Sequence, residues 1–157
     1  MIEAIRQANA EDLAHLADLA KTAVDEQTPD RGGFIWSQRE AIEIPAGPTL
    51  SAAIDDPESF VLVGTIDEEI VGYARAHLEA LRNKETIAVI TDIFVIEGAR
   101  EVGVGELMIE ALVSWAGEKG CRGLDAIVLP GNRQTKNFFE TAHFTARAII
   151  VHRSLFI

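Results

Sequence analysis

The first third of the chain contains two regular patterns followed by an irregular one. Residues 2–6 have the length and composition of a short strand, and Asn9 follows as a candidate helix cap. Residues 11–24 place apolar side chains on one helical face, at Leu13, Leu16, Ala17, Ala20 and Val24. Residues 25–48 contain three prolines and three glycines. We therefore expect a strand, a helix and then a long irregular segment, which in a compact domain is usually functional or mobile.

The middle of the chain has the pattern of a β-sheet. Residues 59–66 and 70–81 are rich in apolar and β-branched side chains, and the polar turn Asp67-Glu68-Glu69 between them predicts a hairpin. Residues 86–96 are almost wholly apolar, which is typical of a central strand covered on both faces. Residues 103–119 then repeat apolar side chains at helical spacing, so a long helix follows the third strand of this group.

The last third of the chain predicts a return to alternating strands and helices. Gly120 supplies a stop for the long helix, and residues 124–129 have the pattern of a strand. A helix over residues 132–142 begins with Asn132 as its cap, and residues 144–155 predict one or two closing strands. This order indicates an α/β (α+β) fold whose sheet is antiparallel early in the chain and parallel late.

Composition and charge narrow the function classes. The chain has 157 residues, 48 % of them hydrophobic and 25 % charged, which is typical of one globular domain spanning residues 1–157. A net charge of −11 disfavours nucleic acid as a partner and favours a cationic small molecule. The alternative is that the charge only keeps the protein soluble. No apolar stretch approaches the ~20 residues of a membrane span, and the charged and polar residues among the first ten lead us to expect no secretory signal. Since Cys121 is the single cysteine, we expect a cytoplasmic protein without a disulfide or metal site.

A glycine-containing turn stands between the apolar third strand of the middle region and the long helix. Gly98 permits the turn, while Gly103 and Gly105 lie where the helix begins. Free backbone N–H groups at a helix N-terminus bind phosphate oxygens, and Arg100 would add a cation, so the turn suits a pyrophosphate. A tight packing turn is the alternative. No Gly-Lys-Ser/Thr ending is present, and a dinucleotide-binding G-x-G-x-x-G would need glycine at Met108.

Three segments of the sequence resemble the GCN5-related N-acetyltransferase (GNAT) superfamily. The family's R/Q-x-x-G-x-G/A signature is matched by Arg100-Glu101-Val102-Gly103-Val104-Gly105. The family's third strand is similar to Ile70-Val71-Gly72-Tyr73-Ala74, and a later family segment resembles residues 132–144. The resemblance implies a mixed, mostly antiparallel sheet of six to seven strands, flanked by about four helices, with splayed parallel strands at the cofactor cleft.

The resemblance also implies acyl transfer from acyl-coenzyme A to an amine by direct attack on the thioester. Backbone amides of the signature loop would hold the pyrophosphate, the pantetheine arm would lie between the splayed strands, and an amide there would polarise the thioester carbonyl. Carried onto this chain, the cofactor-binding residues are Phe94, Val95, Arg100, Glu101, Val102, Gly103, Val104, Gly105, Glu106, Asn132, Phe138 and Phe139. Asn132 has helix capping as an alternative or additional role.

Candidates for the base that deprotonates the amine lie on two predicted strands. Asp92 stands among apolar residues of the central strand, where some family members place an acidic base, and its alternative is a structural carboxylate that caps a bulge or pairs with Arg75. His77, on the neighbouring strand, is the second candidate. The family's usual general acid, a tyrosine, is replaced here by Phe139, so water or Tyr73 would have to protonate the leaving thiolate.

The function favoured at this point is an acyl-CoA-dependent N-acetyltransferase that moves an acetyl group from acetyl-CoA to a primary amine of a small molecule or peptide. Residues 25–50 and 77–84 would shape the acceptor site, with Phe34, Ile35 and Trp36 giving it apolar character unless they only anchor the loop. Phe139 keeps a second hypothesis open, a non-catalytic acyl-CoA-binding or sensing module of the same fold. We expect no nucleic-acid or membrane partner and no metal, and the last strand could pair across a homodimer.

Overall fold

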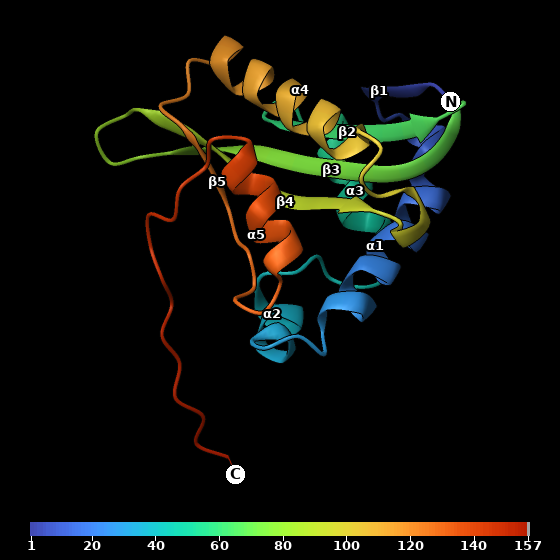
Figure 1. The fold of residues 1–157 in the computed structure, drawn as a ribbon. Coiled ribbons are helices and arrows are strands. Elements are labelled where there is room, and N and C mark those ends of the chain that lie inside the picture. The colour runs from blue at the N-terminus through green and yellow to red at the C-terminus, as the bar shows by residue number, and fades with distance from the viewer. Residues whose placement is uncertain (157) are drawn as a thin grey trace.

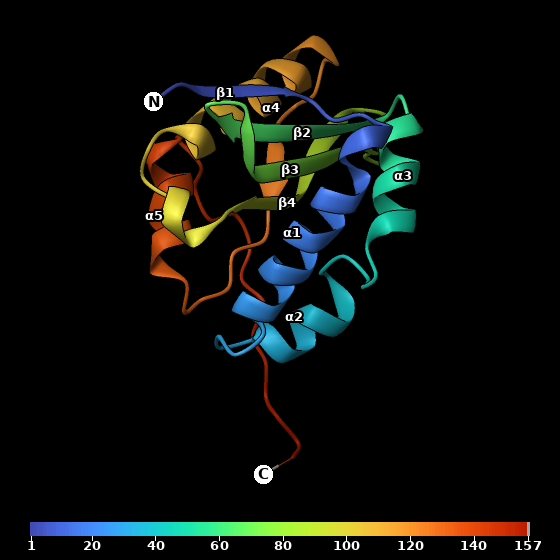
Figure 2. The same cartoon turned by 90° about the vertical axis from the view of Figure 1, so that its right-hand side faces the viewer.

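A five-stranded sheet carries helices on both faces (Figures 1 and 2). This computed structural model describes residues 1–156. The strands are β1 (Glu3–Gln7), β2 (Ser59–Ile66), β3 (Glu69–Ala80), β4 (Thr86–Val95) and β5 (Leu124–Ala126). The helices are η1 (Ala10–Asp12), α1 (Leu13–Gln27), α2 (Gly33–Arg39), α3 (Gly47–Asp55), η2 (Glu97–Ala99), α4 (Val104–Glu118) and α5 (Arg133–Thr141).

Two apolar clusters form the core, one on each face of the sheet. The strands follow one another in the order β1-β2-β3-β4-β5, antiparallel up to β4, and β5 pairs with β4 in parallel. Because side chains alternate along β2, Val61 and Val63 pack toward α1 and α3, whereas Leu62 packs toward α4. Figure 2 shows α1 and α3 on one side of the sheet and α4 and α5 on the other. The sheet is therefore buried on both faces.

The start of the first helical segment is fixed by polar side chains, as the sequence predicted for Asn9. Its Oδ1 accepts a hydrogen bond from the Glu11 amide, and the Asp12 carboxylate accepts one from the Asn9 amide. The Arg6 guanidinium from β1 donates two hydrogen bonds of 2.8 Å to the same carboxylate. This buried carboxylate thus ties the end of β1 to the beginning of the first helix.

Helix α4 approaches the sheet closely because β2 carries a glycine at the crossing point. A Cβ atom on Gly64 would lie 2.4 Å from the Val104 Cγ1 atom, which is closer than atoms pack. Val104 is the first residue of α4, and its side chain is only 1 % exposed. The glycine therefore sets where the N-terminus of α4 sits against the sheet, beside the end of β4.

Strands β4 and β5 stay together only over a short distance. The parallel pairing joins Ala88–Leu124, Val89–Asp125 and Ile90–Ala126, whereas β4 continues to Val95. From residue 91 onward, β4 pairs with β3 on one edge and has no strand on its other edge within the described residues. The sheet is therefore split beyond Ile90, which confirms the expectation of parallel strands that diverge.

The sequence-based expectations differ from the structure in four places. Residues 25–48 contain helix α2 and the start of α3, so this segment is less irregular than expected. Strand β5 ends at Ala126, three residues before the expected end. No strand forms over residues 144–156, so the sheet has five strands and not six or seven. The described residues contain five α-helices where about four were expected.

Two local features explain why residues 25–48 become helical despite their prolines and glycines. Gly33 begins α2 in close contact with the end of α1, because a Cβ atom there would lie 2.3 Å from the Gln27 carbonyl oxygen. Pro48 occupies the first turn of α3, where a proline leaves no helical hydrogen bond unmade. Both helices also pack against α1, and the local pattern does not reveal this packing.

Candidate functional site

A row of backbone N–H groups without hydrogen-bond partners leads into α4. Within residues 1–156, the amides of residues 101–106 donate to no backbone or side-chain acceptor, and the first intrahelical bond begins at the Leu107 amide, 3.1 Å from the Gly103 oxygen. Glu101 and Gly103 both have positive φ angles, 66° and 97°, so the loop is left-handed at two positions just before the helix begins. Such an arrangement, at the positive end of a 15-residue helix, binds anions.

Gly103 and Gly105, the two glycines of the signature, have different surroundings. A Cβ atom on Gly103 would meet nothing within 4 Å, so the space in front of this turn is open. A Cβ atom on Gly105 would lie 3.0 Å from the Phe138 ring of α5, so this glycine lets the helices pack. The tight-packing alternative therefore applies to Gly105, while Gly103 leaves room for a ligand beside the free amides.

Arg100 stands at the entry of this loop, and its guanidinium is directed back toward the sheet. Its Nε donates to the Val95 carbonyl oxygen at 2.8 Å, and an Nη2 donates to the Glu26 carboxylate of α1 at 2.6 Å. The guanidinium also lies 5.5 Å from the centre of the Phe94 ring. Arg100 thus fixes the end of β4 against α1, and these contacts use two of the five N–H donors of its guanidinium.

Phe94 and Val95 lie in the half of β4 that β5 does not accompany. Phe94 is buried against the α1 side of the sheet and faces Tyr73 across the β3–β4 pair. The Val95 carbonyl is already occupied by Arg100. An extended ligand that lies along this strand would therefore use other backbone groups of the free edge.

Asn132 and Phe139, both expected at the cofactor cleft, lie at the cap and within the body of α5. The Asn132 Oδ1 accepts from the Thr135 amide at 3.1 Å, so the predicted cap is confirmed, and its side-chain amide group keeps its donors for another partner. Phe139 is buried, with its ring centre 5.4 Å from that of Phe138 and 5.1 Å from that of Phe144. The Phe139 ring therefore belongs to an aromatic core beneath α5.

The register of β3 and β4 assembles a buried polar group on the α1 side of the sheet. The Tyr73 hydroxyl donates to Asp92 Oδ2 at 2.6 Å, and the Arg75 Nε donates to Asp92 Oδ1 at 2.8 Å. A bulge at this point leaves Thr91 between the paired positions, and its hydroxyl donates to the Arg75 carbonyl at 3.1 Å. Bulges commonly re-aim side chains beside active sites.

Tyr73 keeps its proton over an unusually wide pH range. Its side chain is 1 % exposed, and burial raises the pKa of its hydroxyl well above the ordinary value of 10.0. The negative charge and hydrogen bond of Asp92 raise that pKa further. At neutral pH, Tyr73 is therefore a hydrogen-bond donor whose proton is committed to Asp92.

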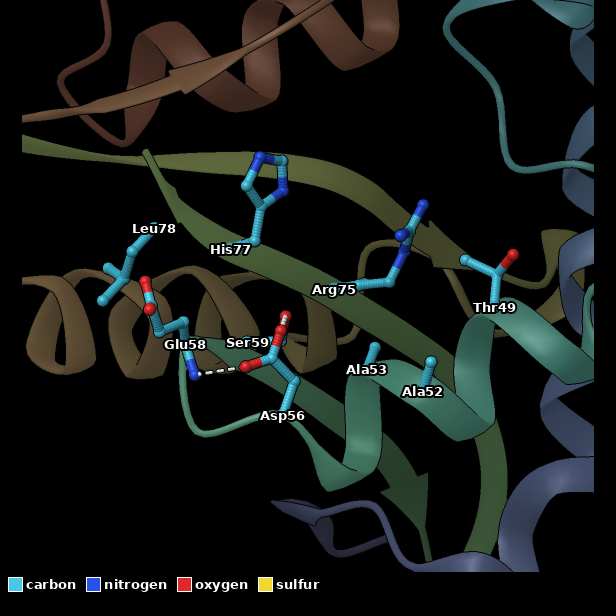
Figure 3. A pocket seen from close by; sticks show the side chains of 9 residues that line it. All are labelled: Thr49, Ala52, Ala53, Asp56, Glu58, Ser59, Arg75, His77 and Leu78. Carbon is cyan, nitrogen blue, oxygen red and sulfur yellow. Dashed lines mark hydrogen bonds between the residues drawn. The ribbon is translucent and has the colours of Figure 1, made fainter. Parts of the chain in front are cut away.

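An open cavity of about 400 Å³ lies between α3 and the outer half of β3 (Figure 3). Figure 3 shows Arg75 and His77 projecting from the same side of β3. The residues that line the cavity are Thr49, Ala52, Ala53, Asp56, Glu58, Ser59, Arg75, His77 and Leu78. Because Arg75 also binds Asp92, this cavity adjoins the buried polar group.

The structure brings Tyr73, Arg75 and Asp92 together, and three residues that sequence reasoning did not single out line the adjoining cavity. Asp56 and Glu58 line the cavity together with Ser59, which is paired with His77 in the β2–β3 register, and the acidic run around Pro57 was the only signal for the two carboxylates. Phe34 and Ile35 do not line the cavity and are 71 % and 42 % exposed. Trp36 packs against the core and anchors α2.

Among residues 1–156, no cluster of three or more His, Cys, Asp or Glu side chains is arranged to hold a metal ion. In the same part of the chain, every helix is too short or too polar to cross a membrane.

Comparisons with known proteins agree with this architecture. The family described as "Acetyltransferase (GNAT) family" matches residues 12–144. The uncharacterized N-acetyltransferase YhfO of Bacillus subtilis (strain 168) is 25 % identical over 153 residues, which cover 96 % of this chain and 95 % of that protein.

Solved structures show the same fold over nearly the whole chain. A variant of the BH1408 protein from Bacillus halodurans superposes with a TM-score of 0.82 at 26 % identity, covering 99 % of both chains. An aminoglycoside N-acetyltransferase in complex with CoA superposes with a TM-score of 0.73 at 20 % identity, covering 98 % of this chain and 95 % of that one. Since the family match spans most of the sequence, this chain belongs to the GNAT acetyltransferase family.

Proposed function

We propose that this protein transfers an acetyl group from acetyl-CoA to a primary amine of a small molecule or peptide. Family membership establishes acetyl transfer in general terms. The choice of acetyl-CoA as the acetyl donor rests on the backbone amides of residues 101–106, which have no hydrogen-bond partner and lie beside the open space at Gly103. A pyrophosphate fits these donors, because several N–H groups and a helix dipole converge on one position. The related fold solved with CoA supports the same donor.

The split between β4 and β5 is the proposed slot for the pantetheine arm. Acetyl-CoA, when bound, supplies the thioester carbonyl that the amine attacks. In this chain, the free edge of β4 near Phe94 and Val95 offers backbone groups for an extended ligand, and the Asn132 side-chain amide offers further donors. An amide at this edge would polarise the carbonyl oxygen as charge develops on it.

Asp92 is the proposed base, acting on the amine directly or through one water molecule. It lies on the half of β4 that has a free edge, and Tyr73 and Arg75 hold both of its oxygens in place. Each carboxylate oxygen keeps a second lone pair for an incoming proton donor. Tyr73 is then a positioning residue, and His77 at the cavity wall remains the alternative base.

Protonation of the leaving thiolate falls to water in this proposal. Phe139 has no proton to give, and its ring is enclosed by Phe138 and Phe144. Transfer from Tyr73 would be uphill, because the pKa of its hydroxyl lies well above 10.0 and that of an ordinary thiol is about 8.5. A thiolate of that pKa is nevertheless a tolerable leaving group near neutral pH.

The cavity beside α3 is the proposed acceptor site. Asp56 and Glu58 give one wall negative charge, which suits an ammonium group, and the net charge of −11 attracts cations over a longer range. His77 and Ser59 add hydrogen-bonding groups on the other wall. Arg75 links this cavity to Asp92, so an amine entering here approaches the base.

Two variants that differ only by a charge test the pyrophosphate site. Gly103→Asp and Gly103→Asn place side chains of equal size and equal backbone strain in the open space at this turn. We expect the aspartate variant to bind CoA at least about tenfold more weakly than the asparagine variant at low salt, because like charges about 5 Å apart repel. Calorimetric titration measures both affinities.

Pantetheine, which lacks the pyrophosphate, is the control ligand and should bind the two variants equally. Matching urea unfolding curves for the two variants exclude a folding effect. Equal CoA affinities of the aspartate and asparagine variants would contradict the proposed cradle. Acetyl transfer itself is measured as thiol release from acetyl-CoA across a panel of amines, and no release with any amine would contradict the enzymatic assignment.

A further inference from the structure

The Arg75 guanidinium keeps most of its hydrogen-bond donors free. Its Nε donates to Asp92, whereas neither of its two Nη atoms makes a hydrogen bond within residues 1–156. A guanidinium is permanently charged, and all of its N–H donors except the one on Nε lie on these two atoms. The Arg75 side chain is only 16 % exposed. The protein therefore encloses most of this charge and leaves its Nη donors for a further acceptor.

The free Nη donors lie at the wall of the cavity beside α3. Every buried polar side-chain atom of the described residues has a hydrogen-bond partner, so the Nη atoms, which have none, reach accessible surface. Arg75 lines the cavity, and Figure 3 shows its side chain projecting from β3 on the same side as His77. A guanidinium with free donors binds a planar carboxylate through paired hydrogen bonds.

Arg75 and Asp92 together match the two charges of an amino-acid head group. The Arg75 Nε lies 2.8 Å from Asp92 Oδ1, so the free Nη donors and the Asp92 carboxylate are neighbours. In an α-amino acid the ammonium and the carboxylate are attached to one carbon, so the ammonium can face Asp92 while the carboxylate faces Arg75. Each charge that leaves water then has a charged partner, and the head group adds no net charge.

The opposite end of the cavity carries a free carboxylate. The Glu58 carbonyl accepts a hydrogen bond from the Leu78 amide, so Glu58 lies beside a residue that is roughly 10 Å along β3 from Arg75. Figure 3 shows Arg75 and Glu58 at opposite ends of the cavity. The Asp56 oxygens accept from the Glu58 amide and the Ser59 hydroxyl, whereas the Glu58 carboxylate has no hydrogen-bond partner in the described part of the chain.

The α3 wall of the cavity suits an aliphatic chain. Its lining residues include Ala52 and Ala53, whose methyl groups offer no hydrogen bond. A linear stem such as the four-carbon stem of lysine would extend from a head group at Arg75 toward Glu58 and end in an ammonium. The arrangement of charges and methyl groups in this cavity thus corresponds to a basic α-amino acid.

We propose that the acceptor is a basic α-amino acid of the lysine type. Its carboxylate binds the Arg75 Nη atoms, its α-amine lies at Asp92, and its side-chain ammonium lies at Glu58. This proposal rests on the proposed acetyl transfer and names the substrate of that same cavity. The reaction forms the amide bond to the α-nitrogen and breaks the thioester carbon–sulfur bond. Of the two protons that the ammonium loses, one passes through Asp92 to solvent and the other reaches the CoA thiolate through water.

A substrate panel on the full-length protein tests both charged contacts. Cadaverine differs from L-lysine only by lacking the carboxylate, and L-norleucine differs only by lacking the side-chain amine. We expect kcat/KM, measured as thiol release from acetyl-CoA, to be at least about tenfold higher for lysine than for either analogue, because each analogue leaves a charged group without its partner. Mass spectrometry of the product should identify Nα-acetyl-lysine.

Substitutions identify the protein side of each contact. Arg75→Gln should bring the lysine-to-cadaverine ratio of kcat/KM to within about threefold of one, and Arg75→Lys, which keeps the charge, should retain part of the preference. Because both substrates use Asp92, an effect of these substitutions on the base cancels in the ratio. Glu58→Gln should abolish only the preference for lysine over norleucine. Glu68→Gln, in the turn between β2 and β3, is the matched charge control and should change neither ratio.

Three results would overturn the proposal. The first is a wild-type enzyme that acetylates cadaverine as efficiently as lysine, a comparison that stands even if Arg75→Gln does not fold. The second is an unchanged lysine-to-cadaverine ratio in Arg75→Gln. The third is Nε-acetyl-lysine as the main product, which would reverse the assigned orientation.

Failure of the proposed acetyl transfer has a different signature, since no amine then releases thiol. Calorimetric titration with lysine and cadaverine still tests the Arg75 contact in that case. Wild-type protein should bind lysine at least about tenfold more tightly than cadaverine, and Arg75→Gln should lose that preference. Equal affinities of the wild type for the two ligands would overturn the proposal.

Discussion

Removal of the Tyr73 hydroxyl tests the buried polar group on which the proposed base depends. Tyr73→Phe keeps the ring in place and deletes the donor of the 2.6 Å hydrogen bond to Asp92. The Asp92 side chain is 7 % exposed, so water replaces the lost donor poorly. A hydrogen bond to a charged group contributes roughly 1.5–3 kcal/mol, and we expect the free energy of unfolding at pH 8 to fall by about that amount.

The same change should lower the melting temperature by roughly 3–12 °C, since 1 kcal/mol corresponds to about 2–4 °C in a domain of this size. Thr65→Val is a suitable comparison, because the Thr65 side chain is buried but makes only a 3.4 Å hydrogen bond to the neutral Ala4 carbonyl. We expect that variant to lose about 0.5–1.5 kcal/mol at most. The two variants separate a charged hydrogen bond from a neutral one.

The alkaline side supplies an independent measurement of the same group. Burial first, and the Asp92 charge second, raise the pKa of Tyr73 in the folded protein above 10.0, its value in an unfolded chain. Above pH 10 the unfolded chain loses the tyrosine proton while the folded chain keeps it. The unfolded state therefore binds fewer protons, and stability falls as pH rises, by up to about 1.4 kcal/mol per pH unit. Below pH 10 the Tyr73 contribution is fully present.

The sequence makes this measurement direct, because Tyr73 is the single tyrosine of the chain. Near-ultraviolet absorbance of tyrosinate should stay absent from the folded protein through pH 10 and should titrate normally in denaturant. The stability difference between wild type and Tyr73→Phe should shrink above pH 10. A folded-state tyrosinate midpoint near 10, or a difference that is the same at pH 8 and pH 11, would refute the buried hydrogen bond.

Three further changes test other parts of the structure. Asp92→Asn should lower kcat by about 100-fold and flatten the pH–rate profile, whereas His77→Ala should leave the profile in place; the opposite result would transfer the base to His77. Phe139→Tyr should raise the rate of thiol release if a proton donor is missing at this position, and an unchanged rate would leave that step to water. The hydrogen bond from Arg6 holds the pKa of the Asp12 carboxyl below 3.8, so this carboxylate stabilises the wild type above about pH 4 and the stabilisation is lost at lower pH. Asp12→Asn should remove that part of the pH dependence. Acid unfolding curves of wild type and variant that coincide would contradict this.

Local sequence pattern was enough to predict the elements whose side chains repeat with a period. The apolar stripe of α4, the strand pattern of β2 and the polar turn before β3 depend only on local spacing, and all three form where expected. The signature loop could also be predicted, because its glycines and the start of the following helix are neighbours in the chain. Burial of one helical face or of alternate strand positions imposes these periods on the sequence.

Which polar groups contact each other depends on packing between distant segments and could not be predicted from local pattern. Tyr73 and Asp92 are 19 residues apart, and a bulge at Thr91 sets the register that joins them. The same holds for Arg100, whose partner Glu26 lies 74 residues away on α1 and could not be read from the loop.

The structure also decided that residues 144–156 do not close their own sheet. Their pattern is that of a strand, but a strand needs a partner edge, and local sequence does not specify which chain supplies it. Periodic burial is a local property that sequence records, whereas register and partner choice are settled by packing between distant segments.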